Sequence, residues 1–407
     1  MNYAKPSPYR WIVLVVFMFN VALSQLLWLT FCAISTDAAA VFTKGNIDNI
    51  DFLSILFMFT LILLTLPSAW LIEKLGLKFG CGIGVLFLTV FGALRAFSPN
   101  YTWLIVTSCL CAIGQPFVVN AFTKVASNWF PEKEEVLASG LLSMAIFIGM
   151  IAAMFVPDII LAPYRKTGSI KEGITAILNL YAILSVIGLV LFLSLVKNKP
   201  KHAPNPIAAE KKLTMTAGLK SIFKNRDFNL VLGACFIGMG AFNAIMTKID
   251  FIFKGRSLGI DPAVAAGIIG GVIVVGGIFG SVIMSALSDA FHRRKFFLII
   301  ATIFDIPLLL GITYAPNIWA VGICGFLFGF FLVSALPIVL TYAVEKTHPV
   351  PETISNSILM MSGQVSGIIF VLYFNVMLLA FFFGIGLILN FLITEIEQKK
   401  VVHVHRS

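Results

Sequence analysis

Two polar side chains lie inside long apolar segments of this 407-residue chain, where they could bind a ligand. Trp28 presents an aromatic face, and a cationic amine over such a face gains about 1–2 kcal/mol when the pair is desolvated. Gln364 carries an amide that could orient the same ligand by hydrogen bonding. The alternative is that Trp28 packs between helices while Gln364 bonds a backbone carbonyl. The residues alone therefore indicate either a neutral, aromatic and amide-lined site or polar contacts between helices.

Other polar side chains recur at helical spacing, so each set shares one face of its segment. The sets are Asn20, Ser24, Trp28, Phe31 and Ser35; Ser139, Ser143 and Phe147; Asn243, Thr247 and Asp250; and Asn356, Met360, Gln364 and Gly367. Polar atoms are costly in lipid unless they face the interior of a bundle or a cavity. We therefore expect these four faces to line a central cavity.

Ionisable side chains inside the apolar segments are few, so each is a candidate functional group. Asp250 and Lys254 are four residues apart, and we expect them to pair near the end of their segment. Asp305 lies nearer the middle of its segment, where it either pairs locally or takes up a proton.

The chain has no pattern typical of a catalytic or metal site. All five His residues lie in predicted loops or in the C-terminal tail, outside HxxxxD and HExxH patterns. The six Cys residues fall in apolar segments without a CxxC pair, and no Gly-rich nucleotide-binding loop is present. We therefore predict that the chain is not an enzyme and has no metal or cofactor. A polytopic membrane enzyme is much less favoured.

The elements that must position these side chains are membrane-spanning helices. Hydrophobic residues make up 59% of the chain and charged residues 12%, which is too little charge to cover a water-soluble domain. Apolar runs of the roughly 20 residues that a bilayer requires recur along the chain. They are apolar on every side and longer than the alternating strands of membrane barrels, which have about 10 residues. We therefore predict an all-α integral membrane protein.

Twelve spans are predicted, six on either side of a polar central segment. They cover residues 11–35, 51–72, 79–97, 102–128, 135–160, 173–196, 226–252, 261–287, 296–313, 317–343, 353–372 and 375–396. This layout is typical of duplicated transporters. We predict an N-terminal six-helix bundle over residues 1–196, a basic cytoplasmic linker over 197–225, and a C-terminal six-helix bundle with its tail over 226–407. We expect a monomer.

Basic residues are concentrated in the loops, above all in the linker. Residues 197–226 hold eight Lys or Arg against the single acid Glu210. The positive-inside rule places this linker and both termini on the cytoplasmic side. We expect the protein to lie in the plasma or inner membrane of the cell. This topology explains the net charge of +10 without a nucleic-acid partner. The expected partners are the lipid bilayer and a small-molecule substrate.

A short charged motif follows the second span and recurs after the eighth. The first copy has Glu73 and Lys74 after a small residue, and the second has Asp289 and Arg293. The motif resembles the loop signature of the major facilitator superfamily. The resemblance implies two six-helix bundles and ion pairs that break when a cytoplasmic gate opens. Glu345, at the end of the tenth span, is a further candidate for gating or charge pairing.

Distinctive segments also occur in several spans. They are Gln115-Pro116-Phe117-Val118-Val119-Asn120, Ala126-Ser127-Asn128-Trp129-Phe130-Pro131, Gly240-Ala241-Phe242, Pro337, and Ser362-Gly363-Gln364-Val365-Ser366-Gly367, together with Trp28 and Ile34-Ser35. These segments resemble the feline leukaemia virus subgroup C receptor-related (FLVCR) family. The resemblance implies facilitated transport of choline and ethanolamine, with haem export also proposed for that family. It also implies a cation site built from a first-helix Trp, a seventh-helix Tyr and Gln side chains.

Part of that site is present in this chain. Trp28 and Gln364 match it, whereas Asn243 stands at the position of the Tyr and Phe147 at that of a fifth-helix Gln. A replacement ring would then come from Phe147 or Phe242. The candidate substrate-binding residues are Trp28, Gln364, Asn243, Phe242, Phe147, Gln115 and Asn20.

The resulting hypothesis is a secondary transporter that moves a small organic solute by alternating access. A choline- or ethanolamine-like amine is the first candidate substrate. The strongest polar faces carry amides, hydroxyls and aromatic rings, which favours a facilitator driven by the substrate gradient. The alternative is a proton-coupled symporter, or an exporter of another small metabolite or of haem. A non-transporting receptor is less favoured, because it would be expected to carry a sizeable soluble domain.

Overall fold

The computed structural model describes residues 7–200, 221–256, 258–291, 293–347, 350 and 352–395, and all regular structure in these ranges is helical. The N-terminal part contains α1 (Tyr9–Trp28), η1 (Cys32–Ile34), α2 (Ser35–Phe42), α3 (Ile47–Leu94), η2 (Arg95–Phe97), α4 (Tyr101–Ala112), α5 (Gly114–Val119), α6 (Phe122–Trp129), α7 (Glu132–Thr167) and α8 (Ile170–Leu195). The C-terminal part contains α10 (Arg226–Thr247), α11 (Ile249–Phe253), α12 (Pro262–Phe291), α13 (Arg294–Ile303), α14 (Asp305–Tyr314), α15 (Ile318–Thr347), α16 (Glu352–Leu372) and α17 (Val376–Leu392).

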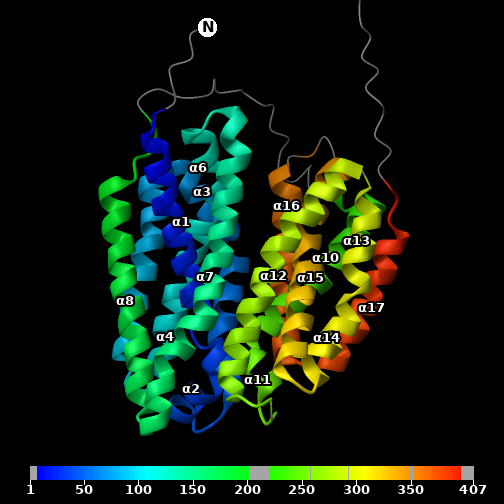
Figure 1. Cartoon of the computed structure of the whole chain (residues 1–407). Coiled ribbons are helices and arrows are strands. Elements are labelled where there is room, and N and C mark those ends of the chain that lie inside the picture. Colours follow the sequence, from blue (N-terminus) through cyan, green and yellow to red (C-terminus); the bar gives the residue numbers. More distant parts are fainter. Residues whose placement is uncertain are drawn as a thin grey trace, which may run out of the picture.

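These helices form two groups that lie side by side in Figure 1, which we call the N half (α1–α8) and the C half (α10–α17). Most of the predicted linker between them, residues 201–220, lies outside the described residues. The division into two six-helix bundles with this linker stays a prediction.

The described helices are long and apolar enough to cross a membrane. Ten helical segments meet that criterion. One of them, Ile47–Phe97, has 51 residues and is broken at Gly76, whose φ of 81° lies in the left-handed region that favours glycine. Val376–Leu392 is a shorter apolar helix of 17 residues. The all-helical membrane fold is confirmed, whereas the count of twelve stays a prediction.

Several predicted spans are interrupted helices instead of continuous ones. The interruptions fall after Trp28, at Ile113, at Asn120 and Ala121, at Lys248, and at Phe304. Hydropathy shows how long an apolar run is but not where its helix breaks. A helix break inside a membrane is stable where side chains or neighbouring helices satisfy the freed backbone groups. The predicted spans over 11–35, 102–128, 226–252 and 296–313 therefore contain helix breaks that hydropathy does not locate.

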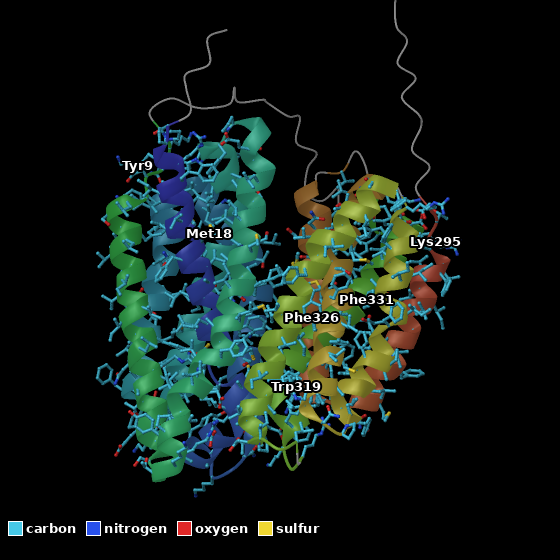
Figure 2. All side chains as sticks on the ribbon, in the orientation of Figure 1. Tyr9, Met18, Lys295, Trp319, Phe326 and Phe331 are labelled. Atoms are coloured by element: carbon cyan, nitrogen blue, oxygen red, sulfur yellow. The ribbon has the colours of Figure 1, made fainter. Side chains whose placement is uncertain are left out.

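The C half is built around the contact of α12 with α15. A Cβ at Gly276 or Gly280 would collide with the backbone oxygens of Phe326 and Phe330. Glycine therefore permits a backbone approach that any side chain would prevent. Figure 2 shows Phe326 on α15, facing the region where the two helices run together.

The two halves meet through two main helix pairs, α7 with α12 and α3 with α16. Figure 1 shows them converging towards the end that carries α2 and α11, which we call the α2 end. The opposite end carries Tyr9 and Lys295 in Figure 2 and is called the N-terminal end. Trp319 lies at the α2 end and is 82% exposed, as expected for a tryptophan at a membrane interface.

Candidate functional site

Trp28 is held at the point where α1 ends. The backbone N–H of Leu29 donates to the Gln25 oxygen, and the chain then leaves the helix and turns into η1. The indole N–H of Trp28 donates to the backbone oxygen of Ser54 in α3, at 3.1 Å. Trp28 is only 8% exposed, and a buried indole N–H needs such an acceptor. This hydrogen bond therefore fixes the orientation of the ring.

One face of α3 connects Trp28 with the C half. Ser54 and Met58 lie one turn apart on that face. A Cβ at Gly367 of α16 would lie 3.1 Å from the Met58 sulfur and 3.1 Å from Asn243 of α10. Trp28 and Asn243 thus belong to one region where both halves meet.

Gln364 and Phe242 are sequence neighbours of two residues that join α10 to α16. Asn243 donates from Nδ2 to the backbone oxygen of Gly363 at 3.4 Å, which joins α10 to α16. Gln364 follows Gly363 in the chain and is partly exposed, and its side chain makes no hydrogen bond within the described residues. Phe242 precedes Asn243 and is partly buried against the core. Gln364 thus carries an unengaged amide on α16, three residues before Gly367, and such a polar group is one that a small ligand can use.

We call this set of residues the Trp28 region. It comprises Trp28, Ser54, Met58, Phe242, Asn243, Gln364 and Gly367.

Three other predicted binding residues belong to helices of the N half, and a binding role for them stays a prediction. Phe147 of α7 is partly buried against the core, and Gln115 of α5 is 3% exposed. Asn20 is fully buried and donates to the backbone oxygen of Gly188 at 3.4 Å, so it joins α1 to α8. Within the described structure, no hydrogen bond connects the amides of Asn20 and Gln115 with the Trp28 region.

A charged contact at the α2 end, which the sequence reasoning missed, joins the two halves. Lys248 lies at the break between α10 and α11. Its Nζ is 2.7 Å from Asp48 Oδ1 and 2.8 Å from Asp51 Oδ2, both in α3. Lys248 is 5% exposed and Asp51 is 2% exposed. The only sequence signal for this ion pair was that ionisable residues occur in apolar segments, and this signal does not identify the partner of Lys248.

Asp250 forms a second link between the halves. Its Oδ2 accepts hydrogen bonds from Ser35 Oγ at 3.1 Å and from the backbone N–H of Thr36 at 2.7 Å. In the described chain no ion pair joins Asp250 to Lys254, so the predicted pair is wrong. Helical spacing identifies only partners within one helix, whereas the hydrogen-bond donors to Asp250 lie in the other half. We call this set of contacts the α2 latch, made by Ser35, Thr36, Asp48, Asp51, Lys248 and Asp250.

Burial and pairing together set the protonation of the latch. Lys248 and Asp250 follow the apolar span Arg226–Thr247. Burial by itself lowers the pKa of Lys248, but the Asp51 and Asp48 carboxylates outweigh it and raise this pKa above its ordinary value. Burial raises the pKa of Asp250, against the effect of its two hydrogen bonds. Lys248 is therefore charged in the closed latch, whereas Asp250 is protonated more readily there than a carboxyl group in water.

Two predicted gating residues at the N-terminal end form ion pairs within their own halves. Glu73 lies 3.1 Å from Lys124 Nζ, inside the N half. Glu345 lies 3.0 Å from Arg294, inside the C half. These pairs therefore stabilise each half separately and do not join the halves.

Among the remaining gating candidates, the described side chains of Lys74 and Arg293 give no ion pair between the halves. Lys74 lies over the ring of Trp70 in its own helix, 4.9 Å from the centroid. Arg293 is exposed, and the side chain of Asp289 lies outside the described structure. A gating role for Glu73, Lys74, Asp289, Arg293 and Glu345 stays a prediction.

Asp305 is an isolated buried acid at the start of α14. It is 2% exposed, its Oδ1 has no hydrogen-bond partner, and no ion pair reaches it within the described chain. The predicted local pair is therefore not found there, which leaves the proton site as the other alternative. Among the described residues, no group of three or more His, Cys, Asp or Glu could hold a metal ion.

The model of the Major Facilitator Superfamily matches residues 11–371. Solute carrier family 49 member A3 of Xenopus tropicalis is 27% identical over 90% of this chain and 77% of its own length. The choline/ethanolamine transporter FLVCR2 of Homo sapiens is 28% identical over 91% of this chain and 72% of its own length. The predicted resemblance to the FLVCR family is confirmed.

Solved structures with the same fold include transporters in different conformations. A bacterial homologue of the human lysosomal transporter Spinster, inward-facing and unoccupied, has a TM-score of 0.70 at 15% identity, covering 90% of this chain and 81% of the other. The transporter FucP in its outward conformation has a TM-score of 0.65 at 17% identity, covering 95% of this chain and 100% of the other. At these identities the similarity establishes the fold alone.

Proposed function

Because this chain belongs to the Major Facilitator Superfamily and is a transporter and not an enzyme, we propose that it carries a small organic cation of the choline or ethanolamine kind across a membrane. The cation binds in the Trp28 region and moves by alternating access, in which the α2 end and the N-terminal end open in turn. The substrate gradient drives the movement.

The observation that carries this proposal is the fixed indole of Trp28, bonded to α3, together with the unengaged amide of Gln364 on α16, the helix that packs against α3 from the other half. The Ser54 oxygen holds the indole N–H at 3.1 Å, which leaves the ring face as the group available to a ligand. A quaternary ammonium cannot donate a hydrogen bond, so an aromatic face suits it better than a hydrogen-bond acceptor does. Gln364 and Asn243 then supply amides for a hydroxyl group of the ligand. The choline/ethanolamine transporters among the relatives support the same class of substrate.

The orientation in the membrane is part of the proposal. We assign the N-terminal end to the cytoplasm, with both termini and the basic linker on that side and the protein in a plasma or inner membrane. The concentration of Lys and Arg in residues 197–226 supports this assignment. With this orientation, the closed α2 latch belongs to a conformation that faces the cytoplasm.

Proton coupling is a second candidate, favoured by two buried acids. Asp51 is 2% exposed and lies in the contact between the halves, and Asp305 is 2% exposed without an ion pair in the described chain. A carboxylate that changes its exposure during transport could carry a proton together with the substrate. The pH gradient in the experiment below distinguishes this coupling from facilitation.

The test is uptake of radiolabelled choline and ethanolamine into liposomes that hold the purified protein, with and without a pH gradient. Loss of the cation–π contact, about 1–2 kcal/mol, predicts roughly a 5- to 30-fold weaker apparent affinity for Trp28→Ala. Gln364→Ala should weaken uptake in the same direction. Trp319→Ala is the matched control, because Trp319 is 82% exposed at the α2 end.

Each outcome has a definite meaning. Saturable uptake that weakens in Trp28→Ala and Gln364→Ala but not in Trp319→Ala supports the amine site. Stimulation by a pH gradient would support proton coupling. Absence of uptake of both amines under every gradient would reject the amine assignment.

A further inference from the structure

Arg95 is a buried arginine without an acidic partner in the described chain. It begins η2, directly after α3, and is 1% exposed. No described carboxylate lies within ion-pair distance, and its Nε has no hydrogen-bond partner among the described residues. A buried cation is costly unless its surroundings supply negative charge. The neighbours of Arg95 must therefore supply it.

The end of α1 supplies that charge. Arg95 Nη1 donates to the backbone oxygen of Leu27 at 2.8 Å. The helix ends one residue later, and the last carbonyl groups of a helix carry partial negative charge. The same guanidinium lies over the ring of Phe31, 5.2 Å from its centroid. Leu27 precedes the break and Phe31 follows it, so Arg95 contacts both sides.

We propose that Arg95 is a positioning residue that holds the break in α1 and thereby fixes Trp28 for its ligand. Trp28 lies between the two residues that Arg95 contacts, so the backbone that carries the indole is fixed from both sides. The segment then continues through η1 to Ser35 and Thr36 of the α2 latch. Arg95 therefore also connects the Trp28 region with the closure of the α2 end. The ligand part of this inference rests on the proposed function.

A similar arginine in the C half provides a matched control. Arg256 donates to the backbone oxygens of Ile312 and Ala315 at 2.7 and 2.6 Å, at the end of α14. Its guanidinium lies 5.4 Å from the centroid of the Phe253 ring. Arg256 thus binds a helix end and an aromatic ring as Arg95 does, but on a segment that does not contain Trp28.

The first experiment measures the position of Trp28 without any ligand. In full-length protein with the other five tryptophans changed to Phe, Trp28 is the only source of indole fluorescence. We expect Arg95→Met to raise the rate of acrylamide quenching at least threefold and to shift the emission to longer wavelength. Arg95→Lys should retain most of the protection, and Arg256→Met should equal the parent protein. Phe31→Leu, which keeps the arginine, should give a smaller change in the same direction.

The second experiment measures choline uptake in the same variants with all tryptophans present. We expect Arg95→Met to raise the apparent KM at least tenfold and Arg95→Lys to recover most of it. In the Trp28→Phe background, where the bond to Ser54 is already lost, Arg95→Met should raise KM less than twofold further. Such non-additivity is the signature of a residue that acts through Trp28.

The two measurements separate the inference from the proposed function. Quenching that is equal in Arg95→Met and the parent protein would overturn the positioning role. If Arg95→Met and Phe31→Leu both elute as aggregates, the role is overturned as well, since the contact of Arg95 with Phe31 would then be required for folding in general. Additive effects of Arg95→Met and Trp28→Phe on KM would have the same meaning. Altered quenching together with no choline uptake by any variant would uphold the positioning role and reject the amine substrate.

Discussion

The two ends of this transporter use the same types of charged residue in opposite ways. At the α2 end, Lys248 of the C half pairs with Asp48 and Asp51 of the N half. At the N-terminal end, Glu73 pairs with Lys124 and the described ion pairs each stay inside one half. The α2 end is therefore closed by contacts between the halves, whereas the described charges at the N-terminal end leave the halves independent.

Because of burial, the ion pairs at the two ends also differ in how much free energy they contribute. Asp51 is 2% exposed, while the Glu73 side chain is 70% exposed. An exposed pair contributes about 0–1 kcal/mol, but removal of one partner from a buried pair costs about 3–5 kcal/mol. Charges at the α2 end can therefore determine which conformation is populated, and those at Glu73 can only modulate it.

The largest effect is expected for Lys248→Met. This change leaves the buried Asp51 carboxylate without its cation, which should destabilise the closed α2 end by about 3–5 kcal/mol. Cys32 reports on that end, because it is 2% exposed and precedes the latch residue Ser35 by three positions. With the other five cysteines changed to Ser, maleimide should label Cys32 at least tenfold faster in Lys248→Met than in the parent protein.

Two further variants sharpen this result. Lys248→Met combined with Asp51→Asn removes both charges and should restore most of the protection of Cys32. Lys124→Met, at the N-terminal end, is the control and should leave labelling unchanged. Equal labelling in Lys248→Met and the parent protein would show that the latch does not hold the α2 end closed.

An intermediate effect is expected from pH through Asp250. Burial raises its pKa in the closed latch, so the closed state binds a proton more readily than an open, hydrated one. The resulting stabilisation is present at acidic pH and is lost as the pH rises through this raised pKa. Spin labels at Lys44 and Lys254, both exposed near the α2 end, should therefore show longer distances at neutral than at acidic pH.

The variant Asp250→Asn tests the assignment of this pH response. It keeps a neutral side chain at every pH, so the distance distribution should stay at its acidic form. A response as large as that of the parent protein would assign the titration to another group. Lys248 contributes none of it, since its pKa is raised and it stays charged over this range.

The smallest effect is expected for Glu73→Gln. Its pair with Lys124 is exposed and screened, and Lys124 also donates to the backbone oxygen of Ile72 at 2.8 Å. Loss of the pair should change the uptake rate less than about fivefold, which corresponds to about 1 kcal/mol. A change comparable to that of Lys248→Met would show that the two ends are equally sensitive to charge.

The sequence predicted correctly those features that depend on a single segment of the chain. The length of the apolar runs predicted membrane helices, and Trp28 and Gln364 stood out because polar groups inside such runs need a partner. Asn20 met the same criterion, but its amide joins α1 to α8. A polar residue on a helical face can bond to a neighbouring helix or face a cavity, and the pattern is the same in both cases.

The contacts that the sequence could not predict are between residues far apart in the chain. Lys248 and Asp48 are separated by 200 positions, and Arg95 and Leu27 by 68. Composition and hydropathy by themselves determined that this chain is a helical membrane protein, because the transfer of each segment into lipid depends on that segment alone. Only the tertiary structure decided where α1 breaks and which charges join the halves. A carbonyl group freed at a helix break, or a charge buried in one half, is stabilised only by the donors and charges that neighbouring helices place beside it.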